Sequence, residues 1–124
     1  MAQSASPRSP RVLVVEDQML VALEIASLLE DIGCEPVGPV GHVQTAMLAV
    51  TKERLDAALL DVDLAGESVE PIADFLRRHG IPFALVTGYA RDRLPVRLRE
   101  HPYVAKPFTF AEVKAAVWAL FAPA

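Results

Sequence analysis

The sequence predicts an α/β domain in which five parallel strands alternate with five helices and lie between two helical layers. Short apolar runs rich in β-branched residues recur along the chain, and such runs are typical of strands buried on both faces. Longer segments with apolar residues at helical spacing separate them, and the connections are short. Alternation of this kind implies right-handed crossovers, which produce a parallel sheet covered by helices on both faces.

Turn residues and apolar spacing give the expected boundaries of these elements. Strands are expected at Arg11–Val15, Glu35–Val40, Asp56–Leu60, Pro82–Val86 and Pro102–Ala105. Helices are expected at Gln18–Ile32, His42–Arg54, Ser68–His79, Arg91–Glu100 and Phe108–Phe121.

Glycine and proline mark the ends of several elements. Gly33 and Gly80 follow helices, as residues just past a helix end commonly do. Pro36 and Pro39 interrupt the second strand, and this confines it to an edge of the sheet because proline cannot donate to a central ladder. Pro95 breaks the charged fourth helical segment, so we expect a short or irregular helix there.

The last helix carries a sequence signal at its start. Thr109 stands at the N-cap position, and Glu112 follows three residues later. This spacing is that of a capping box, in which the two side chains satisfy backbone N–H groups reciprocally.

Composition limits the class of protein. The chain has 124 residues, 52% of them apolar and 23% charged, which suits one globular domain. No apolar run approaches the ~20 residues that cross a bilayer. The net charge of −4 argues against a nucleic-acid partner, and the lone Cys34 forms no disulfide framework. We therefore expect a cytoplasmic protein without membrane or nucleic-acid partners.

The domain organisation is simple. Residues 1–10 are rich in Ser, Pro and Ala and are expected to form a disordered tail. Residues 11–124 form the single expected domain, and no linker leads to an output domain.

Polar groups follow every expected strand except the proline-containing edge strand. Glu16 and Asp17 follow the first strand, Asp61 the third, Thr87 the fourth and Lys106 the fifth. In an open parallel sheet, ligands bind beyond the carboxyl ends of the strands, so these groups are expected to meet at one edge.

This set of side chains suits phosphoryl transfer. Crowded carboxylates repel one another unless a cation joins them, and Mg²⁺ prefers such hard oxygen ligands. A carboxylate nucleophile, a metal, an ammonium and a hydroxyl together supply the positioning and charge neutralisation that phosphoryl transfer needs.

The segments VVEDQ, LLDVDL, VTGYA and YVAKPF, in this order and at these spacings, resemble the motifs of response-regulator receiver domains of two-component signalling. The resemblance covers Arg11 to the C-terminus. It implies the doubly wound flavodoxin-like (CheY-like) fold with strand order 2-1-3-4-5. It also implies a signalling protein that assists its own phosphorylation and dephosphorylation, rather than an enzyme.

The resemblance assigns a role to each matching residue. Asp61 is implied as the phosphoacceptor. Asp17 and Asp61 are implied as direct ligands of Mg²⁺ (or Mn²⁺), with Glu16 acting through metal-bound water. The backbone carbonyl of Asp63 is implied as the third protein ligand.

The remaining roles concern the phosphoryl group and its readout. Thr87 is implied to hydrogen-bond the phosphoryl group, and Lys106 to form an ion pair with it after a cis peptide bond to Pro107. Thr87 and Tyr103 are implied as the switch pair, although Tyr103 equally fits an ordinary half-buried strand aromatic. Asp63 and Tyr89 occupy the positions that tune dephosphorylation.

Several positions depart from the usual family pattern. The acidic pair reads Glu16-Asp17 in place of Asp-Asp. Ala65 stands where many receivers have proline, and we expect this replacement to loosen the loop.

The stretch PFALVTGY partly resembles the signature of the alphaproteobacterial stand-alone receivers called the FAT GUY group.

The expected partners are proteins. They are a histidine kinase or phosphotransfer protein upstream and a protein partner downstream, or an onward phosphorelay. A homodimer through the fourth helix, fifth strand and fifth helix is one further candidate.

Three alternatives stay open. Asp61-Val62-Asp63 formally matches the Asp-x-Asp motif of haloacid-dehalogenase-like phosphatases, although Leu64 and Ala65 follow it. A flavodoxin would need a phosphate-binding loop after the first strand, where acids stand instead. A degenerate receiver would act only as a protein-binding module.

Overall fold

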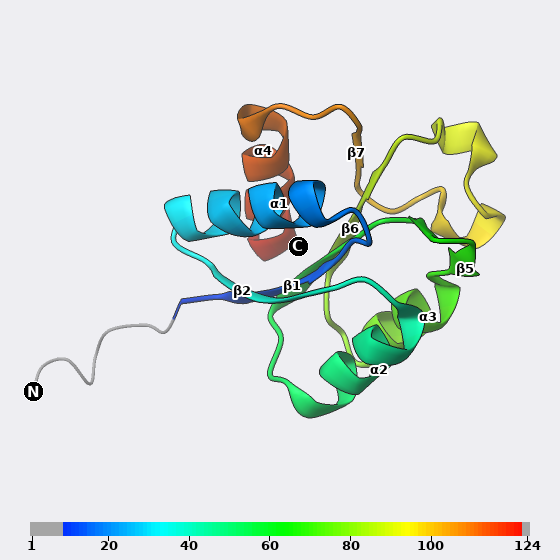
Figure 1. Cartoon of the computed structure of the whole chain (residues 1–124), viewed down its shortest axis with the longest axis horizontal. Coiled ribbons are helices and arrows are strands. Elements are labelled where there is room, and N and C mark those ends of the chain that lie inside the picture. The colour runs from blue at the N-terminus through cyan, green and yellow to red at the C-terminus, as the bar shows by residue number, and fades with distance from the viewer. Residues whose placement is uncertain (1–8, 123–124) are drawn as a thin grey trace, which may run out of the picture.

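A parallel sheet lies between two pairs of helices (Figure 1). The structure is a computed structural model and describes residues 9–122, so most of the expected N-terminal tail lies outside the described residues. The sheet strands are β1 (Arg11–Val15), β2 (Glu35–Val40), β3 (Ala57–Leu60), β6 (Phe83–Thr87) and β7 (Tyr103–Ala105). The α-helices are α1 (Met19–Asp31), α2 (Val43–Lys52), α3 (Glu70–Arg78) and α4 (Phe110–Phe121).

The strand order is β2-β1-β3-β6-β7, and every neighbouring pair in this sheet is parallel. The predicted fold and strand order are therefore confirmed. The proline-containing strand β2 lies at an edge, as expected, because its prolines cannot donate to a second neighbour.

Successive residues of each inner strand point to opposite faces and build two hydrophobic cores. In β3, Ala58 and Leu60 belong to the core on the α2 and α3 side, whereas Ala57 and Leu59 belong to the core on the α1 and α4 side (Figure 1). All four side chains are buried. Burial on both faces explains why these strands read as continuous apolar runs without alternating polarity.

The segment 91–100 is irregular, as expected from Pro95, but it contains no α-helix, so the predicted count of five helices is not met in the described residues. Two 3₁₀ turns stand there, η2 (Arg91–Arg93) and η3 (Val96–Leu98). Pro95 removes a backbone donor between them, and the side chain of Arg99 takes the carbonyl of Leu94, which an α-helix would have paired with the N–H of Leu98. Arg91 donates to the carbonyls of Arg99 and His101, and Arg99 Nε donates to the carbonyl of Leu94.

A short antiparallel hairpin directly after β3 was not predicted. It consists of β4 (Asp63–Leu64) and β5 (Glu67–Ser68). Ala65 and Gly66 form its two-residue turn, with φ angles of 52° and 87°. The expectation that Ala65 loosens this loop is wrong, because the turn is tight and its positive φ could not be adopted by proline.

The predicted capping box at α4 is present. The Thr109 hydroxyl accepts a hydrogen bond from the backbone N–H of Glu112, and a Glu112 carboxylate oxygen accepts from the N–H of Thr109. These bonds satisfy N–H groups that a helix start leaves without partners.

Replacing Thr109 with Ala is expected to lower the free energy of unfolding by about 1 kcal/mol, because the cap acceptor is lost. Chemical denaturation measures this change. Thr109→Ser keeps the hydroxyl and serves as the control, and a loss of equal size in both variants would contradict the assignment of the cap.

None of the helices in the described part of the chain has the length and apolar character needed to cross a membrane.

Candidate functional site

Four strands deliver the predicted site residues to one edge of the sheet. Glu16 and Asp17 follow β1, Asp61 follows β3, and Lys106 follows β7, while Thr87 is the last residue of β6. The ladder continues up to this edge, where the N–H of Asp61 donates to the carbonyl of Val15 at 2.8 Å. The positions of the side chains are therefore set by strand pairing and do not depend on flexible loops.

Three carboxylates lie together at this edge. Glu16, Asp17 and Asp61 each offer an oxygen within 4.8 Å of the others. Both oxygens of Glu16 are engaged, one by Lys106 and one by the N–H of Gln18 at 3.1 Å. Asp17 is exposed, and within residues 9–122 its carboxylate accepts no hydrogen bond. Asp17 is thus available for a direct ligand role, whereas Glu16 is suited to an indirect one.

Lys106 lies between two of the acids. Its Nζ is 2.6 Å from Glu16 and 3.3 Å from Asp61, and its side chain is 19% exposed. The peptide bond from Lys106 to Pro107 is cis, as expected. Burial alone would lower the pKa of Lys106, but the hydrogen bond to Glu16 and the negative charges of both acids raise it above its ordinary value. Lys106 therefore carries a positive charge at neutral pH.

Burial raises the pKa of Asp61 to about 6. The neighbouring negative charge of Glu16 acts in the same direction, while Lys106 and the N–H of Asp63 act against it. The N–H of Asp63 donates to Asp61 Oδ1 at 3.3 Å. The ionised form of Asp61 is thus held under electrostatic repulsion that an additional cation would relieve.

A cavity of about 400 Å³ opens over these groups. Its lining residues are Asp17, Gln18, Asp61, Asp63, Ala65, Thr87, Gly88, Tyr89 and Lys106. The Thr87 side chain is buried and accepts a hydrogen bond from the N–H of Tyr89 at 3.1 Å. Its hydroxyl hydrogen remains available for an acceptor inside this cavity.

The donor set fits a hard divalent cation. Mg²⁺ binds oxygen ligands and keeps part of its water shell, so one or two carboxylates and a carbonyl are sufficient. The oxygens of Asp17 and Asp61 meet this requirement, and both residues line the cavity. Neither cysteine nor histidine lines the cavity, so a site selective for soft metals is not indicated.

The structure also shows contacts that sequence patterns did not reveal. The Tyr89 hydroxyl donates to Asp63 Oδ2 at 3.2 Å, and this hydrogen bond with the carboxylate raises the pKa of Tyr89. The Tyr103 hydroxyl donates to the backbone carbonyl of Tyr89 at 2.6 Å. The two residues predicted to tune dephosphorylation thus contact each other, and the predicted switch residue contacts one of them. The spacing of these residues in the sequence gave no signal for either bond.

Tyr103 is also held by a cation. The guanidinium of Arg91 lies over the ring, 4.8 Å from its centroid. In the arginine-rich segment around it, Arg91 and Arg99 fold back onto the chain and donate to backbone carbonyls. The fold therefore fixes the position of Tyr103 from two sides.

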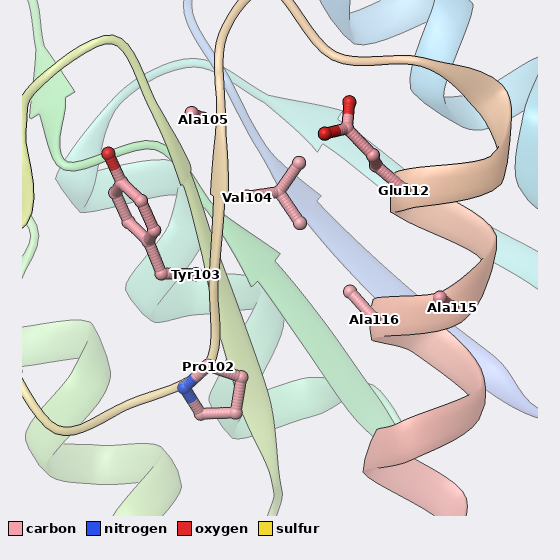
Figure 2. A pocket seen from close by; sticks show the side chains of 7 residues that line it. All are labelled: Pro102, Tyr103, Val104, Ala105, Glu112, Ala115 and Ala116. Atoms are coloured by element: carbon pink, nitrogen blue, oxygen red, sulfur yellow. The ribbon is translucent and has the colours of Figure 1, made fainter.

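A second hollow lies apart from this edge, between β7 and α4 (Figure 2). It has a volume of about 590 Å³. Figure 2 shows Val104 pointing toward α4 and Tyr103 pointing away from it, with Ala115 and Ala116 across the hollow. Its acid, Glu112, is engaged in the capping box. No reactive groups converge there. The chemistry of this protein is therefore expected at the edge of the sheet that carries Glu16, Asp17 and Asp61, called the acidic edge below.

Comparisons with known proteins agree with this geometry. The chain is 27% identical over 120 residues to the transcriptional regulatory protein PdtaR of Mycobacterium tuberculosis, a match that covers 94% of the chain and 58% of that protein. A scan against protein-family models gave no match. The chain spans about half the length of the curated relatives that it matches, with 58% and 44% covered in PdtaR and in PhyR of Methylorubrum extorquens.

Solved structures give matches over nearly the whole chain. SdrG from Sphingomonas melonis Fr1 superposes with a TM-score of 0.83 and 37% identity, covering 94% of this chain and 100% of that one. A structure of SdrG in its BeF3-activated conformation has a TM-score of 0.78 and 38% identity, with coverages of 90% and 96%. The REC domain of the response regulator PhyR from Erythrobacter litoralis has a TM-score of 0.81 and 28% identity, with coverages of 94% and 95%.

Proposed function

Because the chain belongs to the receiver-domain family of response regulators, we propose that it accepts a phosphoryl group on Asp61 from a phosphohistidine of a kinase or phosphotransfer protein. The observation that carries this proposal is the surroundings of Asp61. Its carboxylate faces a cavity, beside two further acids and within 3.3 Å of the Lys106 ammonium. The finer placement among the FAT GUY receivers is supported by the partial match of PFALVTGY to their signature.

Each side chain has a distinct role in the proposed transfer. An Asp61 oxygen attacks phosphorus, the P–N bond to the donor imidazole breaks, and an acyl phosphate forms as the neutral imidazole leaves with a proton. Lys106 is free to exchange its carboxylate contact for one with the arriving phosphoryl oxygens, and the Thr87 hydroxyl donates to another. These donors neutralise charge that would otherwise oppose the transfer.

Mg²⁺ is the proposed cofactor, with Mn²⁺ as a substitute. Asp17, Asp61 and the backbone carbonyl of Asp63 would hold it, and Glu16 would act through a bound water. When bound, the ion would neutralise the carboxylates and the phosphoryl oxygens.

The proposed readout is a change of conformation passed to another protein. Phosphorylation adds about −1.5 to −2 charges at pH 7 and would draw the Thr87 hydroxyl toward the phosphoryl group. Tyr103 is coupled to this movement because it binds the carbonyl of Tyr89, two residues after Thr87. The SdrG structure in a BeF3-activated conformation supports such a response in a relative. A protein partner, an onward phosphorelay, or a homodimer through the β7 and α4 face would receive the signal.

The contacts of Asp63 disfavour the haloacid-dehalogenase alternative. Both oxygens of the Asp63 carboxylate are already engaged, by the N–H of Gly66 and the hydroxyl of Tyr89, so the second aspartate of the motif is not directed at a substrate on Asp61. We expect no turnover of p-nitrophenyl phosphate. Steady release of p-nitrophenol by the purified protein would favour the phosphatase instead.

The proposal is tested with acetyl phosphate, a small donor of phosphoryl groups. Wild type with Mg²⁺ is expected to gain one phosphoryl group, detected by intact mass, and to gain none when a chelator is present. Borohydride reduction followed by peptide mapping is expected to show homoserine at position 61. Absence of modification under these conditions would support the degenerate-receiver alternative. Homoserine at the position of another aspartate would show that this other residue is the phosphoacceptor.

A further inference from the structure

The segment after Asp61 is a tight hairpin. Asp63 pairs with Ser68 and Leu64 with Glu67, which leaves a two-residue turn. Both turn residues have positive φ, which is the geometry of a type I′ turn and matches the twist of paired strands. Ala65 adopts a φ of 52°, a conformation rare for a residue with a Cβ, and such constrained backbone persists where the surroundings determine it.

The hairpin is tied to the rest of the fold on several sides. Leu64 is fully buried in the core on the α2 and α3 side. Asp63 Oδ1 accepts from the N–H of Gly66 at 3.0 Å, and the other oxygen of Asp63 accepts from Tyr89. The Asp63 carboxylate therefore closes the turn and does not reach toward a metal, so only its backbone carbonyl is left for that role.

Glu67 connects the hairpin to a helix that lies before β3 in the chain. Its Oε1 accepts from the backbone N–H of Val43, the first residue of α2, at 3.2 Å. The N-cap residue of α2, His42, makes no side-chain cap. Glu67 thus satisfies a helix-start N–H from 24 residues away, and its negative charge is favourable at that end of the helix.

We propose that the β4–β5 hairpin is a positioning arm for the metal site, and that Glu67 is the positioning residue that fixes this arm against α2. The inference rests on the proposed function, because it concerns the same Mg²⁺ site. A hairpin held at Leu64, Asp63 and Glu67 would present the Asp63 carbonyl at a fixed place relative to Asp61. Without the contact of Glu67, the arm would sample other positions and the carbonyl ligand would be less often in place.

The test measures binding of Mg²⁺ alone by calorimetry. Glu67→Ala is expected to weaken Mg²⁺ binding by about tenfold, at the lower end of the range found when supporting groups around a metal are removed. Glu67→Gln keeps an oxygen acceptor for Val43 and is expected to stay within about twofold of wild type. Thr109→Ala, which removes the cap of α4, is expected to leave Mg²⁺ affinity unchanged and so controls for general loss of stability.

A second readout uses the metal-free protein. Hydrogen exchange of the Gly66 amide, which donates to Asp63, is expected to be faster in Glu67→Ala than in wild type or Glu67→Gln. Equal Mg²⁺ affinities of wild type and Glu67→Ala, or equal weakening by Thr109→Ala, would overturn the positioning role. If the positioning role fails but wild type binds Mg²⁺, the proposed function still stands. If wild type binds no Mg²⁺, both the positioning role and the proposed function are overturned.

Discussion

Asp61→Asn is expected to be more stable than wild type and yet unable to accept a phosphoryl group. The amide removes the negative charge that is buried beside Glu16, and its nitrogen and oxygen are too weakly nucleophilic to attack phosphorus. Modification by acetyl phosphate is expected to fall below detection. Without metal at pH 7.5, the free energy of unfolding is expected to rise by about 1–2 kcal/mol, a value reduced for the partial solvent access of the cavity.

The sign of the stability change follows from the pKa of Asp61. Its folded value of about 6 lies above the ordinary value of 3.8. Ionised Asp61 therefore destabilises the fold, fully above pH 6 and progressively less as the pH falls toward 4. The advantage of Asp61→Asn is expected to be present at pH 7.5 and to vanish near pH 4.

Chemical denaturation of both proteins at several pH values measures this effect. Asp92→Asn is a matched control, because Asp92 is exposed and forms no ion pair within residues 9–122. It is expected to change stability by less than about 0.5 kcal/mol. Saturating Mg²⁺ is expected to stabilise wild type more than Asp61→Asn. An Asp61→Asn protein less stable than wild type at pH 7.5 would contradict the repulsion inferred here.

Lys106→Met is expected to lower the free energy of unfolding by about 3 kcal/mol at pH 7.5 without metal. Methionine keeps most of the apolar stem but leaves the buried carboxylates of Glu16 and Asp61 without their cation. Removing one partner of a buried ion pair costs this much because the remaining charge stays desolvated. The expected loss is smaller at pH 5, where a carboxyl of raised pKa takes up a proton instead.

Lys114→Met is the matched control for this change. Lys114 lies on the exposed face of α4 and forms no ion pair in the described part of the chain. Chemical denaturation is expected to give free energies of unfolding that differ between the two variants by about 3 kcal/mol at pH 7.5. At pH 5 the difference is expected to be smaller. Equal losses from both variants, or a loss from Lys106→Met that does not vary with pH, would show that Lys106 has no role in charge compensation.

The two variants test the two opposing charges of the same site. Asp61→Asn removes a charge that is held under repulsion, and Lys106→Met removes the charge that partly offsets it. A site of this kind has free energy available for a divalent cation and for the phosphoryl group that follows. The same side chains thus make the metal-free fold less stable and the proposed chemistry possible.

The fold class and the residues that meet at the acidic edge could be predicted from apolar patterns and from the polar residues that follow the strands. Runs such as that of β3 are apolar on both faces, and this pattern requires a parallel sheet between helical layers. Because parallel strands all end at one edge, the polar residues after them had to meet there. Asp61 and Lys106 could therefore be placed together although 45 residues separate them. The N-cap of α4 could also be predicted from the sequence, because its signal is contained within four consecutive residues.

The pairing of the side chains at this edge could not be predicted and is visible in the folded chain alone. Lys106 bonds more closely to Glu16 than to Asp61, and the Asp63 carboxylate binds Tyr89 and Gly66. The hairpin at Ala65 and the 3₁₀ turns near Pro95 also lay beyond sequence patterns. The physical reason is that periodicity reports burial, which acts along whole elements. Side-chain pairing and irregular turns depend on small differences in the distances between segments that are far apart in the sequence and that only packing brings together.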